Sequence, residues 1–430
     1  MAGGLAEVVV VGAGAAGLAS AIFLRRATTS RSVIVLDGAK KPGAKILISG
    51  GSRCNVTNVR VTERDFWGGR STIIRRILRA FPVDETIAFF REIGVPLHEE
   101  ADGKLFPDSN RSRDVLDALL AETSRVGAQL LPDHRVLDVV ADGDTFTVKT
   151  ANVEFRALQV VLATGGRSLP KTGSDGAGLD IAQRLGHTIV ATTPALAPLL
   201  LANDDAMHRD LTGVAQDVEL AVWIDGAIAI RLTGAMLWTH FGVSGPVALN
   251  ASRHWMRAEI EGRTVAVTVS FLPGRSFADV DAEWTQLAID RPRLSVQSAL
   301  ALALPASLAS ALLNTLALDA KTPIAHFPRD DRRRLVRALV EWPLPIVGTR
   351  GYNFAEATAG GIELTEIDPA TMQSRVRRGL YLVGEMLDVD GRIGGFNFQW
   401  AWCTGRIAGE ALSSGAARAQ KIDRRRASSS

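Results

Sequence analysis

The glycine pattern near the N-terminus is the first group of residues whose spacing could serve a chemical purpose. Gly12, Gly14 and Gly17 form G-x-G-x-x-G directly after the β-branched run Val8–Val11. The first glycine of such a loop permits a tight turn, the second lets a pyrophosphate approach the backbone, and the third lets a helix pack on the strand. Phosphates are attracted to the helix N-terminus. We therefore expect dinucleotide contacts from Gly12, Ala13, Gly14, Ala15, Ala16 and Gly17.

An acidic residue and a polar stretch follow this loop. Asp37 ends the apolar strand Val33–Leu36 and lies 20 positions after Gly17 (37 − 17 = 20), where a carboxylate would bond a ribose hydroxyl. The stretch Ala39–Asn58 is polar and glycine-rich, so we expect a loop whose backbone donors lie against a planar ring or an anion. Its candidate cofactor contacts are Lys40, Lys45, Ser49, Gly50, Arg53, Cys54 and Asn55.

Two later segments have buried strands that end in small residues. Gln159–Ala163 leads into Thr164-Gly165, a turn small enough to lie against a cofactor. Leu380–Glu385 ends in Gly-Glu, and Gly394-Gly395 opens a helix whose backbone donors would stabilise negative charge. The candidate contacts here are Ala163, Thr164, Gly165, Gly384, Glu385, Asp390, Gly391, Gly394, Gly395, Phe396, Asn397 and Gln399.

Three of these stretches together resemble one flavoprotein family. GAGAAG at Gly12–Gly17, KKPGAKILISGGSRCNVTN at Lys40–Asn58 and GEMLDVDGRIGGFNFQWAWCTG at Gly384–Gly405 look like the family that includes aminoacetone oxidases and BaiN-type proteins. MLWTHFGVSGP, Met236–Pro246, is also similar. This chain departs from the family pattern at four positions: Ser52 replaces glycine, Val56 leucine, Phe396 tyrosine and Phe398 leucine. The loss of the phenol at Phe396 weakens any proton-transfer role for that position.

The resemblance implies FAD as the cofactor and a Rossmann-like FAD-binding domain of the glutathione-reductase or fumarate-reductase type. In such folds Val136 would present its backbone to the adenine. Oxidation of aminoacetone and reduction of an unsaturated steroid-like ring are family activities. We expect hydride transfer to or from flavin N5 with a small-molecule substrate. Only one G-x-G-x-x-G loop is present, so NAD(P)H, if used, docks transiently at the flavin.

Two further side chains leave alternatives open. His240 could act as a general acid or base under a lid domain, or it could be a histidine with purely structural hydrogen bonds. Cys54 has no C-x-x-C partner, which favours a structural role over a redox one. The sequence Asp388-Val-Asp390-Gly resembles part of a calcium loop but lacks a glutamate at the twelfth position, so we expect no metal.

The elements that must position these residues indicate an α/β fold with an insertion. We expect the FAD-binding domain to comprise residues 1–193 and 346–415, because its glycine segments lie at both ends of the chain. Residues 194–345 read as an inserted domain, with a β-barrel-like part followed by a helical part. Residues 416–430 read as a flexible basic tail.

Composition limits the class of protein. The chain has 430 residues, 47% hydrophobic residues and a formal charge of +3, so it gives no strong signal for nucleic acid. Two cysteines and no signal-peptide or membrane-span pattern favour a cytoplasmic protein. Two alternatives stay open: an RNA-modifying or RNA-binding flavoprotein, with Arg329–Arg334 and the tail as its footprint, and a flavin-binding scaffold without turnover. The oligomeric state is not indicated.

Overall fold

The computed structural model describes residues 5–202 and 207–427. The chain forms two compact units, and each has a hydrophobic core of its own. The first unit comprises Met1–Thr193 and Glu356–Ser430, and the second comprises Pro194–Ala355. Residues 346–355, which the sequence places with the FAD-binding domain, lie in the second unit, where β18 (Ile346–Thr349) pairs with β12 (Leu199–Leu201).

A seven-stranded sheet forms the centre of the first unit, in the order β7-β2-β1-β10-β9-β8, with β20 also paired to β10. β1 is parallel to both of its neighbours, β2 and β10, and the same direction is shared by β7, which pairs with β2, and by β20, which pairs with β10. In contrast, β9 is antiparallel to β10, and β8 is antiparallel to β9. Val8, Val9 and Val10 have no exposed surface, as expected for a parallel strand covered on both faces. The strands are β1 (Leu5–Val11), β2 (Val33–Leu36), β7 (Gln129–Leu131), β8 (Val136–Asp142), β9 (Thr145–Thr150), β10 (Glu154–Leu162) and β20 (Leu380–Leu382).

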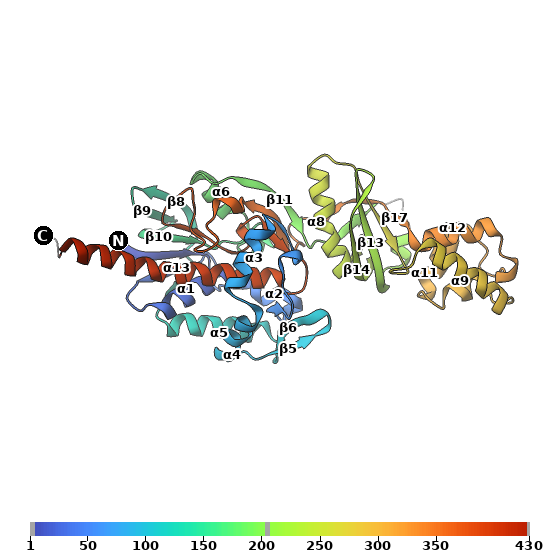
Figure 1. Ribbon diagram of the computed structural model, residues 1–430, viewed down its shortest axis with the longest axis horizontal. Coiled ribbons are helices and arrows are strands. Elements are labelled where there is room, and N and C mark those ends of the chain that lie inside the picture. The colour runs from blue at the N-terminus through green and yellow to red at the C-terminus, as the bar shows by residue number, and fades with distance from the viewer. Residues whose placement is uncertain (1–4, 203–206, 428–430) are drawn as a thin grey trace. The chain divides into compact units, whose positions relative to one another are not determined.

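In the first unit, a helix near the N-terminus packs against the last helix of the chain. α1 (Ala15–Ala27) lies alongside α13 (Phe396–Ala427) (Figure 1). Gly405 and Gly409 permit the contact, since a Cβ atom would lie 2.6 Å from the carbonyl oxygens of Ala16 and Ser20, respectively. α13 also continues through most of the segment expected to be a flexible tail, as far as Ala427. The last three residues of that segment lie outside the described ones.

The remaining elements of the first unit surround the main sheet. Pro82 separates two helices, as its ring predicts. Smaller sheets pair β4 with β21, β6 with β3 and β5, and β11 with β19. The helices are α2 (Ala44–Ser52), α3 (Ser71–Ala80), α4 (Val83–Glu92), α5 (Ser112–Arg125) and α6 (Ala177–Arg184), and the strands are β3 (Thr57–Asn58), β4 (Phe66–Gly68), β5 (Leu97–Glu100), β6 (Lys104–Pro107), β11 (Ile189–Ala195), β19 (Ala357–Ile362) and β21 (Val389–Gly391).

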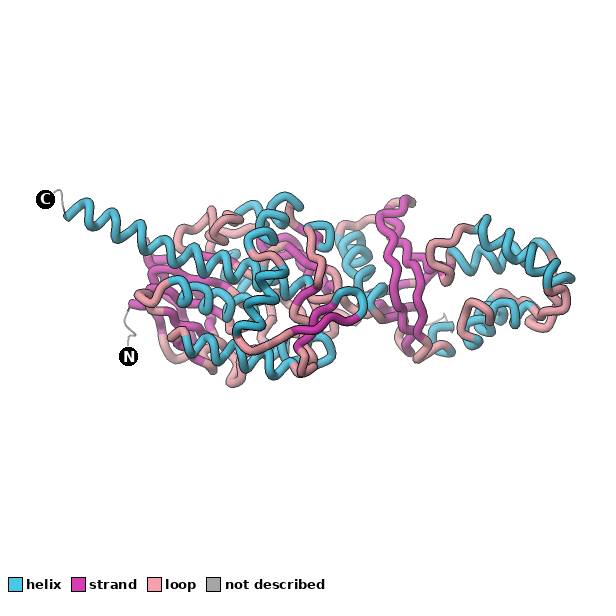
Figure 2. Tube along the Cα trace, turned by 60° about the horizontal axis from the view of Figure 1, so that its bottom comes forward, coloured by secondary structure: helices cyan, strands magenta, loops and turns pink. Residues whose placement is uncertain are grey.

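The second unit contains a curled antiparallel sheet in the order β17-β16-β13-β14-β15-β12-β18. Only Pro345 separates β17 from β18, although they occupy opposite ends of this order, so the edges of the sheet must come together. The sheet is therefore barrel-like, and Figure 2 shows its long strands in magenta. The remaining strands are β13 (Ala215–Ile224), β14 (Ala227–Thr239), β15 (Gly242–Ser244), β16 (Val265–Ser270) and β17 (Trp342–Leu344).

Helices complete the second unit. α8 (Pro246–Ile260) packs on β13 and β14 and buries Val247, Ala248 and Ala251 in the core of the unit. A helical part follows, in which Pro305 interrupts the alanine- and leucine-rich stretch. Its helices are α9 (Phe277–Asp290), α10 (Val296–Leu300), α11 (Ala306–Thr315) and α12 (Arg329–Val340), and the short α7 (Met207–Asp210) lies earlier in the chain. In the part of the chain that the structure describes, we find no helix with the length and hydropathy needed to cross a bilayer.

The contact between α1 and α13 gives a prediction about stability. Gly409→Ala places a methyl group 2.6 Å from the carbonyl oxygen of Ser20, which is backbone and cannot rotate away. We expect a loss of about 2 kcal/mol in the free energy of unfolding, as in other overpacked cores. Chemical denaturation monitored by circular dichroism measures it.

The matched control is Ser414→Ala, an exposed position on the same helix, which should change stability by less than about 0.5 kcal/mol. Equal stability of Gly409→Ala and the parent protein would show that α13 does not need this close approach.

Candidate functional site

The loop between β1 and α1 has the geometry that its glycines predict. Gly12 has φ +102°, and a Cβ atom there would lie 2.5 Å from the carbonyl oxygen of Ala163. A Cβ atom on Gly17 would lie 1.9 Å from the carbonyl oxygen of Gly12. A Cβ atom on Gly14, in contrast, would meet nothing within 4 Å. Packing therefore requires glycine at 12 and 17, while Gly14 leaves space in front of the helix.

The start of α1 offers donors toward that space. The first N–H groups of any helix lack intrahelical acceptors. The N-cap residue of α1 is Gly14, which has no side chain to accept a hydrogen bond from them. In the turn after β10, Thr164 Oγ1 lies against Gly178 and Ser174 Oγ lies beside Gly165; both are buried and have no hydrogen-bond partner among the described atoms. Buried polar groups normally have partners. These hydroxyls and the helix N-terminus are therefore suited to a polar, anionic ligand.

Asp37 closes the other side of the loop. Its carboxylate accepts hydrogen bonds from the backbone N–H groups of Ala13 (2.8 Å) and Ala39 (2.8 Å). The N–H of His134 donates to the backbone carbonyl of Asp37 at 2.7 Å. The structure thus brings Asp37 close to the residues that precede Val136, the first residue of β8. Lys40 is an exposed residue of the same loop.

The expectation of a loop throughout Ala39–Asn58 is wrong, because α2 begins at Ala44. Gly43 adopts a left-handed conformation before the helix, and Ile46 is buried against the core. This apolar anchor outweighs the polar composition on which the loop prediction depended. The helical path breaks at Ser49 (ψ 149°), Gly50 (φ 55°) and Gly51 (φ 68°). The irregular backbone is thus confined to a shorter stretch than expected.

Two predicted contacts in the stretch after this break are engaged with protein groups. Arg53 forms an ion pair with Glu100 (2.5 Å), and its guanidinium lies 4.1 Å from the ring centre of Phe106. Cys54 is fully buried and has φ +63°. Burial raises the pKa of the Cys54 thiol to about 12, so the thiol stays protonated at neutral pH. This protonation state agrees with a structural role.

The C-terminal glycine segment meets the residues that follow Cys54. With its amide oriented to satisfy both ends, Asn55 donates to the carbonyl oxygen of Thr57 (2.8 Å) and accepts from the N–H of Gly395 (3.2 Å). Asn58 donates to the carbonyl oxygen of Gly394 at 3.2 Å. A Cβ atom on Gly395 would lie 2.5 Å from the carbonyl carbon of Thr57. Segments from the two ends of the chain therefore form one continuous wall.

Other predicted contacts of the C-terminal motif support this wall from behind. Gln399 is 1% exposed; its amide nitrogen donates to Phe81 O (2.9 Å), and its oxygen accepts from Thr57 Oγ1 (2.7 Å). The side chain of Asn397 bonds both backbone groups of Gly391. Asp390 and Phe396 are also buried. These side chains, together with Asn55 and Asn58, hold the glycine segment in place.

A polar network joins α2 to the segments that follow β10 and β20 and to the start of β19. The ammonium of Lys45 bonds Ser168 Oγ (2.5 Å) and forms an ion pair with Glu385. Glu385 also accepts from Ser168 Oγ (2.6 Å) and from the N–H of Thr358 (2.9 Å). The side chains of Lys45 and Glu385 are 27% and 17% exposed, so this pair is partly screened from water. Gly384, beside it, would place a Cβ atom 2.8 Å from Ala16 Cβ.

Glu356 is close to this network. The residue is exposed. Desolvation raises the pKa of its carboxyl, while the ammonium of Lys45 acts in the opposite direction. Its carbonyl oxygen accepts a 3.4 Å bond from Ser168 Oγ. Sequence reasoning missed Ser168, Glu356 and Thr358. These are common residue types that lie far from Lys45 in the sequence, so no sequence pattern indicated that they would lie near it.

His240 lies in the second unit, in the turn between β14 and β15. It is exposed, and its ring packs edge-on against Phe241 with 5.1 Å between ring centres. The guanidinium of Arg350 lies 4.6 Å from the ring centre of Phe241 and 3.5 Å from that of Phe354. His240 thus belongs to an aromatic and cationic cluster. Over the described residues, no group of three or more His, Cys, Asp or Glu side chains could hold a metal ion.

The fold and the site together define a Rossmann-type dinucleotide-binding protein. The profile described as the HI0933-like protein Rossmann domain matches residues 6–411, and the chain belongs to this family. It is 32% identical to the 3-dehydro-bile acid delta(4,6)-reductase of Clostridium scindens, over 94% of this chain and 98% of that one. It is also 32% identical to the ribosomal RNA dihydrouridine synthase of Escherichia coli, over 92% and 95% of the two chains.

A solved structure supports the fold. The FrdA chain of Escherichia coli quinol fumarate reductase superposes with a TM-score of 0.51 at 17% identity, covering 97% of this chain and 72% of that one. Together these matches confirm the predicted family, the predicted α/β architecture with a Rossmann-like FAD-binding domain, and the predicted class of FAD-dependent oxidoreductase.

The backbone at Ser52 gives a second prediction about stability. Ser52, where the family pattern has glycine, adopts φ +67° and is exposed. A left-handed conformation costs a residue with a Cβ atom about 1–2 kcal/mol. We expect the relief of this strain in Ser52→Gly to raise the free energy of unfolding by about 1 kcal/mol. The conformational entropy that glycine adds to the unfolded chain offsets part of this gain. Equilibrium urea denaturation measures the change.

A reciprocal variant provides the control. Gly94 has φ +86° with nothing within 4 Å of a Cβ position, so Gly94→Ser should lower stability through backbone strain alone. A less stable Ser52→Gly protein would mean that the serine side chain supports the loop more than its backbone strains it.

Proposed function

We propose that this chain is an FAD-dependent reductase that adds two hydrogens across an electron-poor carbon–carbon double bond conjugated with a carbonyl group. The proposal is carried by the similarity, over 94% and 92% of this chain, to two relatives whose names both describe such a reaction. A delta(4,6)-reductase of a 3-dehydro-bile acid reduces a bond of this kind. Formation of dihydrouridine saturates the double bond of a uracil ring. We propose this shared reaction for the present chain.

The first unit has groups suited to FAD. The open space at Gly14, the free N–H groups of α1 and the hydroxyls of Thr164 and Ser174, which have no partner among the described residues, favour a diphosphate. When bound and reduced, FAD supplies a hydride. We assign the diphosphate to Gly12–Gly17, Ala163, Thr164 and Gly165, the adenosine end to Asp37 and Val136, and the ring end to Ser49, Gly50, Gly394 and Gly395.

The chain itself must hold these segments and deliver a proton to the second substrate carbon. We assign the holding role to Asn55, Asn397 and Gln399, because their amides already bond the glycine segments or their neighbours. His240 stays the candidate proton donor, since its ring is exposed at a turn. Lys45 is a second candidate, because Ser168 and Glu385 hold its ammonium in a fixed place.

The substrate is a small conjugated carbonyl compound or a uracil base in RNA. Identity does not choose between them, since both named relatives are 32% identical to this chain. The arginine-rich helix α12 adds little support for RNA, because several of its charges are paired locally. The pairs are Arg332 with Asp281 (2.9 Å), Arg334 with Asp331 (3.0 Å) and Arg337 with Glu341 (3.5 Å). We favour a small molecule, transient docking of NAD(P)H and a cytoplasmic location.

Two anaerobic half-reactions test the proposed function. We expect NADH or NADPH to bleach the oxidised flavin of the FAD-loaded protein. We then expect a 3-oxo-4-ene steroid, and not a uridine-containing ribosomal RNA transcript, to restore the colour, with a saturated product in equal amount. Stopped-flow absorbance and mass spectrometry of the product measure both steps.

The outcomes separate the parts of the proposal. Reoxidation by the RNA with formation of dihydrouridine would move the substrate to nucleic acid and keep the reaction type. Reoxidation by neither compound, followed by rapid reoxidation once oxygen is admitted, would contradict a double-bond reductase. His240→Asn should slow only the second half-reaction, by roughly 10²-fold if His240 supplies the proton.

The Lys45 network gives a prediction about cofactor retention. Lys45→Met leaves the carboxylate of Glu385 without its cation in the unit that we expect to bind FAD. We expect the Kd for FAD to rise on the order of tenfold, measured by quenching of flavin fluorescence. Lys104→Met, which removes a surface pair with Asp102 (2.9 Å), is the matched control and should leave the Kd unchanged. Unaltered FAD binding by Lys45→Met would remove Lys45 from the cofactor site.

A further inference from the structure

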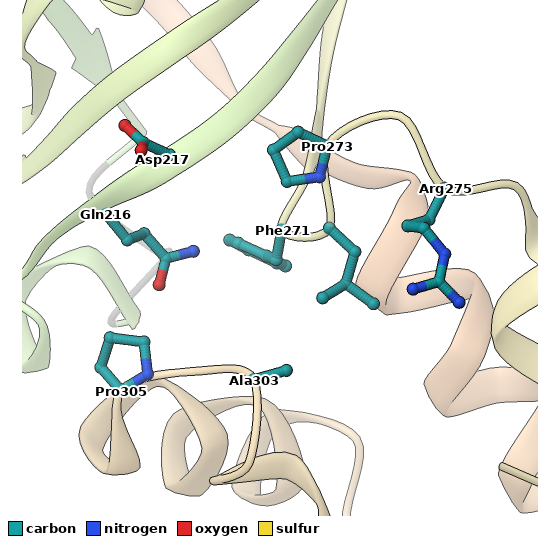
Figure 3. A pocket seen from close by; sticks show the side chains of 8 residues that line it. Gln216, Asp217, Phe271, Pro273, Arg275, Ala303 and Pro305 are labelled. Carbon is teal, nitrogen blue, oxygen red and sulfur yellow. The ribbon is translucent and has the colours of Figure 1, made fainter. Parts of the chain in front are cut away.

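The second unit contains a hollow of ≈ 420 Å³ that no assigned role explains. It lies among the start of β13, the turn after β16 and the connection between α10 and α11 (Figure 3). Its walls present polar and apolar surface in nearly equal measure. They comprise Phe271, Leu272, Pro273, Ala303 and Pro305, with Gln216, Asp217 and Arg275 as the polar members.

Gln216 occupies a position where the strand pattern calls for an apolar residue. Side chains alternate along a strand, and Gln216 shares its face of β13 with Val218, Leu220 and Val222, which have no exposed surface. Figure 3 shows the Gln216 amide directed toward Phe271 and into the hollow, whereas the carboxylate of Asp217 points away from it. The amide therefore faces the same interior as the core of the sheet.

Neither end of this amide is satisfied. Gln216 Oε1 and Nε2 are both buried, and neither has a hydrogen-bond partner in the part of the chain that the structure describes. A buried donor and a buried acceptor without partners both destabilise a folded protein. Such a pair at a core-facing position calls for an explanation, and a bound molecule that completes both hydrogen bonds provides one.

The charges at the hollow do not supply that partner. Arg275 Nη2 bonds Glu283 at 2.6 Å, so its guanidinium is already engaged. Asp217 is exposed on the opposite face of the strand. Besides these charged side chains, the hollow offers the donor and the acceptor of Gln216 side by side, flanked by a phenyl ring and two proline rings.

We propose that this hollow binds a small planar ring that carries an amide edge, an N–H donor next to a carbonyl acceptor. The ligand N–H would donate to Gln216 Oε1, and the ligand carbonyl would accept from Gln216 Nε2. Phe271, Pro273 and Pro305 would cover the ring. A pyrimidine base and a nicotinamide ring with its carboxamide both have this chemistry. The site does not depend on the proposed function, because it is defined by binding alone.

Calorimetric titration of the FAD-loaded full-length protein with uracil and with nicotinamide tests the proposal. Each probe has a matched analogue without amide hydrogens, namely 1,3-dimethyluracil and N,N-dimethylnicotinamide. We expect one probe to bind and its methylated analogue to bind more weakly, on the order of tenfold or more. The probe that binds identifies the source of the amide edge.

Variants locate the binding. Gln216→Met keeps the size of the side chain and removes both polar atoms, so we expect it to abolish the measurable binding and to raise the melting temperature of the ligand-free protein. Glu259→Gln, at an exposed position of α8 that does not line the hollow, should bind as the parent protein does.

The proposal is overturned if neither probe binds up to its solubility limit, if the methylated analogue binds equally well, or if Gln216→Met retains the affinity. A lower melting temperature for Gln216→Met would also overturn it, because the amide would then be hydrogen-bonded in the free protein. The comparison of probe with analogue needs no variant, so it decides the question even if Gln216→Met fails to fold.

Discussion

The close contact between α1 and α13 is the constraint on which the first unit depends. It brings backbone against backbone, because Gly405 and Gly409 have no side chain to separate the helices. α1 carries the first glycine loop and α13 begins directly after Gly394-Gly395. The same contact therefore fixes the distance between the two glycine segments. Any shift of α13 along α1 would open the wall that Asn55 and Gly395 close.

Much of this arrangement could be predicted from the sequence, because local rules determine it. The roles of Gly12 and Gly17 follow from turn geometry, and a run of β-branched residues directly before such a glycine turn favours a buried strand. The meeting of the two chain ends also followed, since neither glycine segment alone could enclose a cofactor. Predicting these features requires only residues that are near one another in sequence, or a family resemblance that spans the chain.

The other features of the site depend on tertiary packing, which no local sequence pattern predicts. α2 formed where a loop was expected, because burial of Ile46 outweighed a polar composition. Ser168 and Thr358 join Lys45 only after β10, β19 and α2 have been brought together. Gln399 was predicted as a cofactor contact, yet its amide is bonded to protein groups behind the wall. Tertiary structure thus decided which polar residues face outward and which hold the backbone.

The insertion of the second unit has a consequence for the order in which the molecule assembles. β10 must pair with β20, and α1 must be covered by α13, but Pro194–Ala355 lies between these partners in the chain. The ribosome therefore completes the inserted unit, which has a hydrophobic core of its own, before β20 and α13 have emerged. Until then α1 keeps an apolar face uncovered, and closing so long a segment is slow. The glycine wall is consequently among the last parts of the molecule to form.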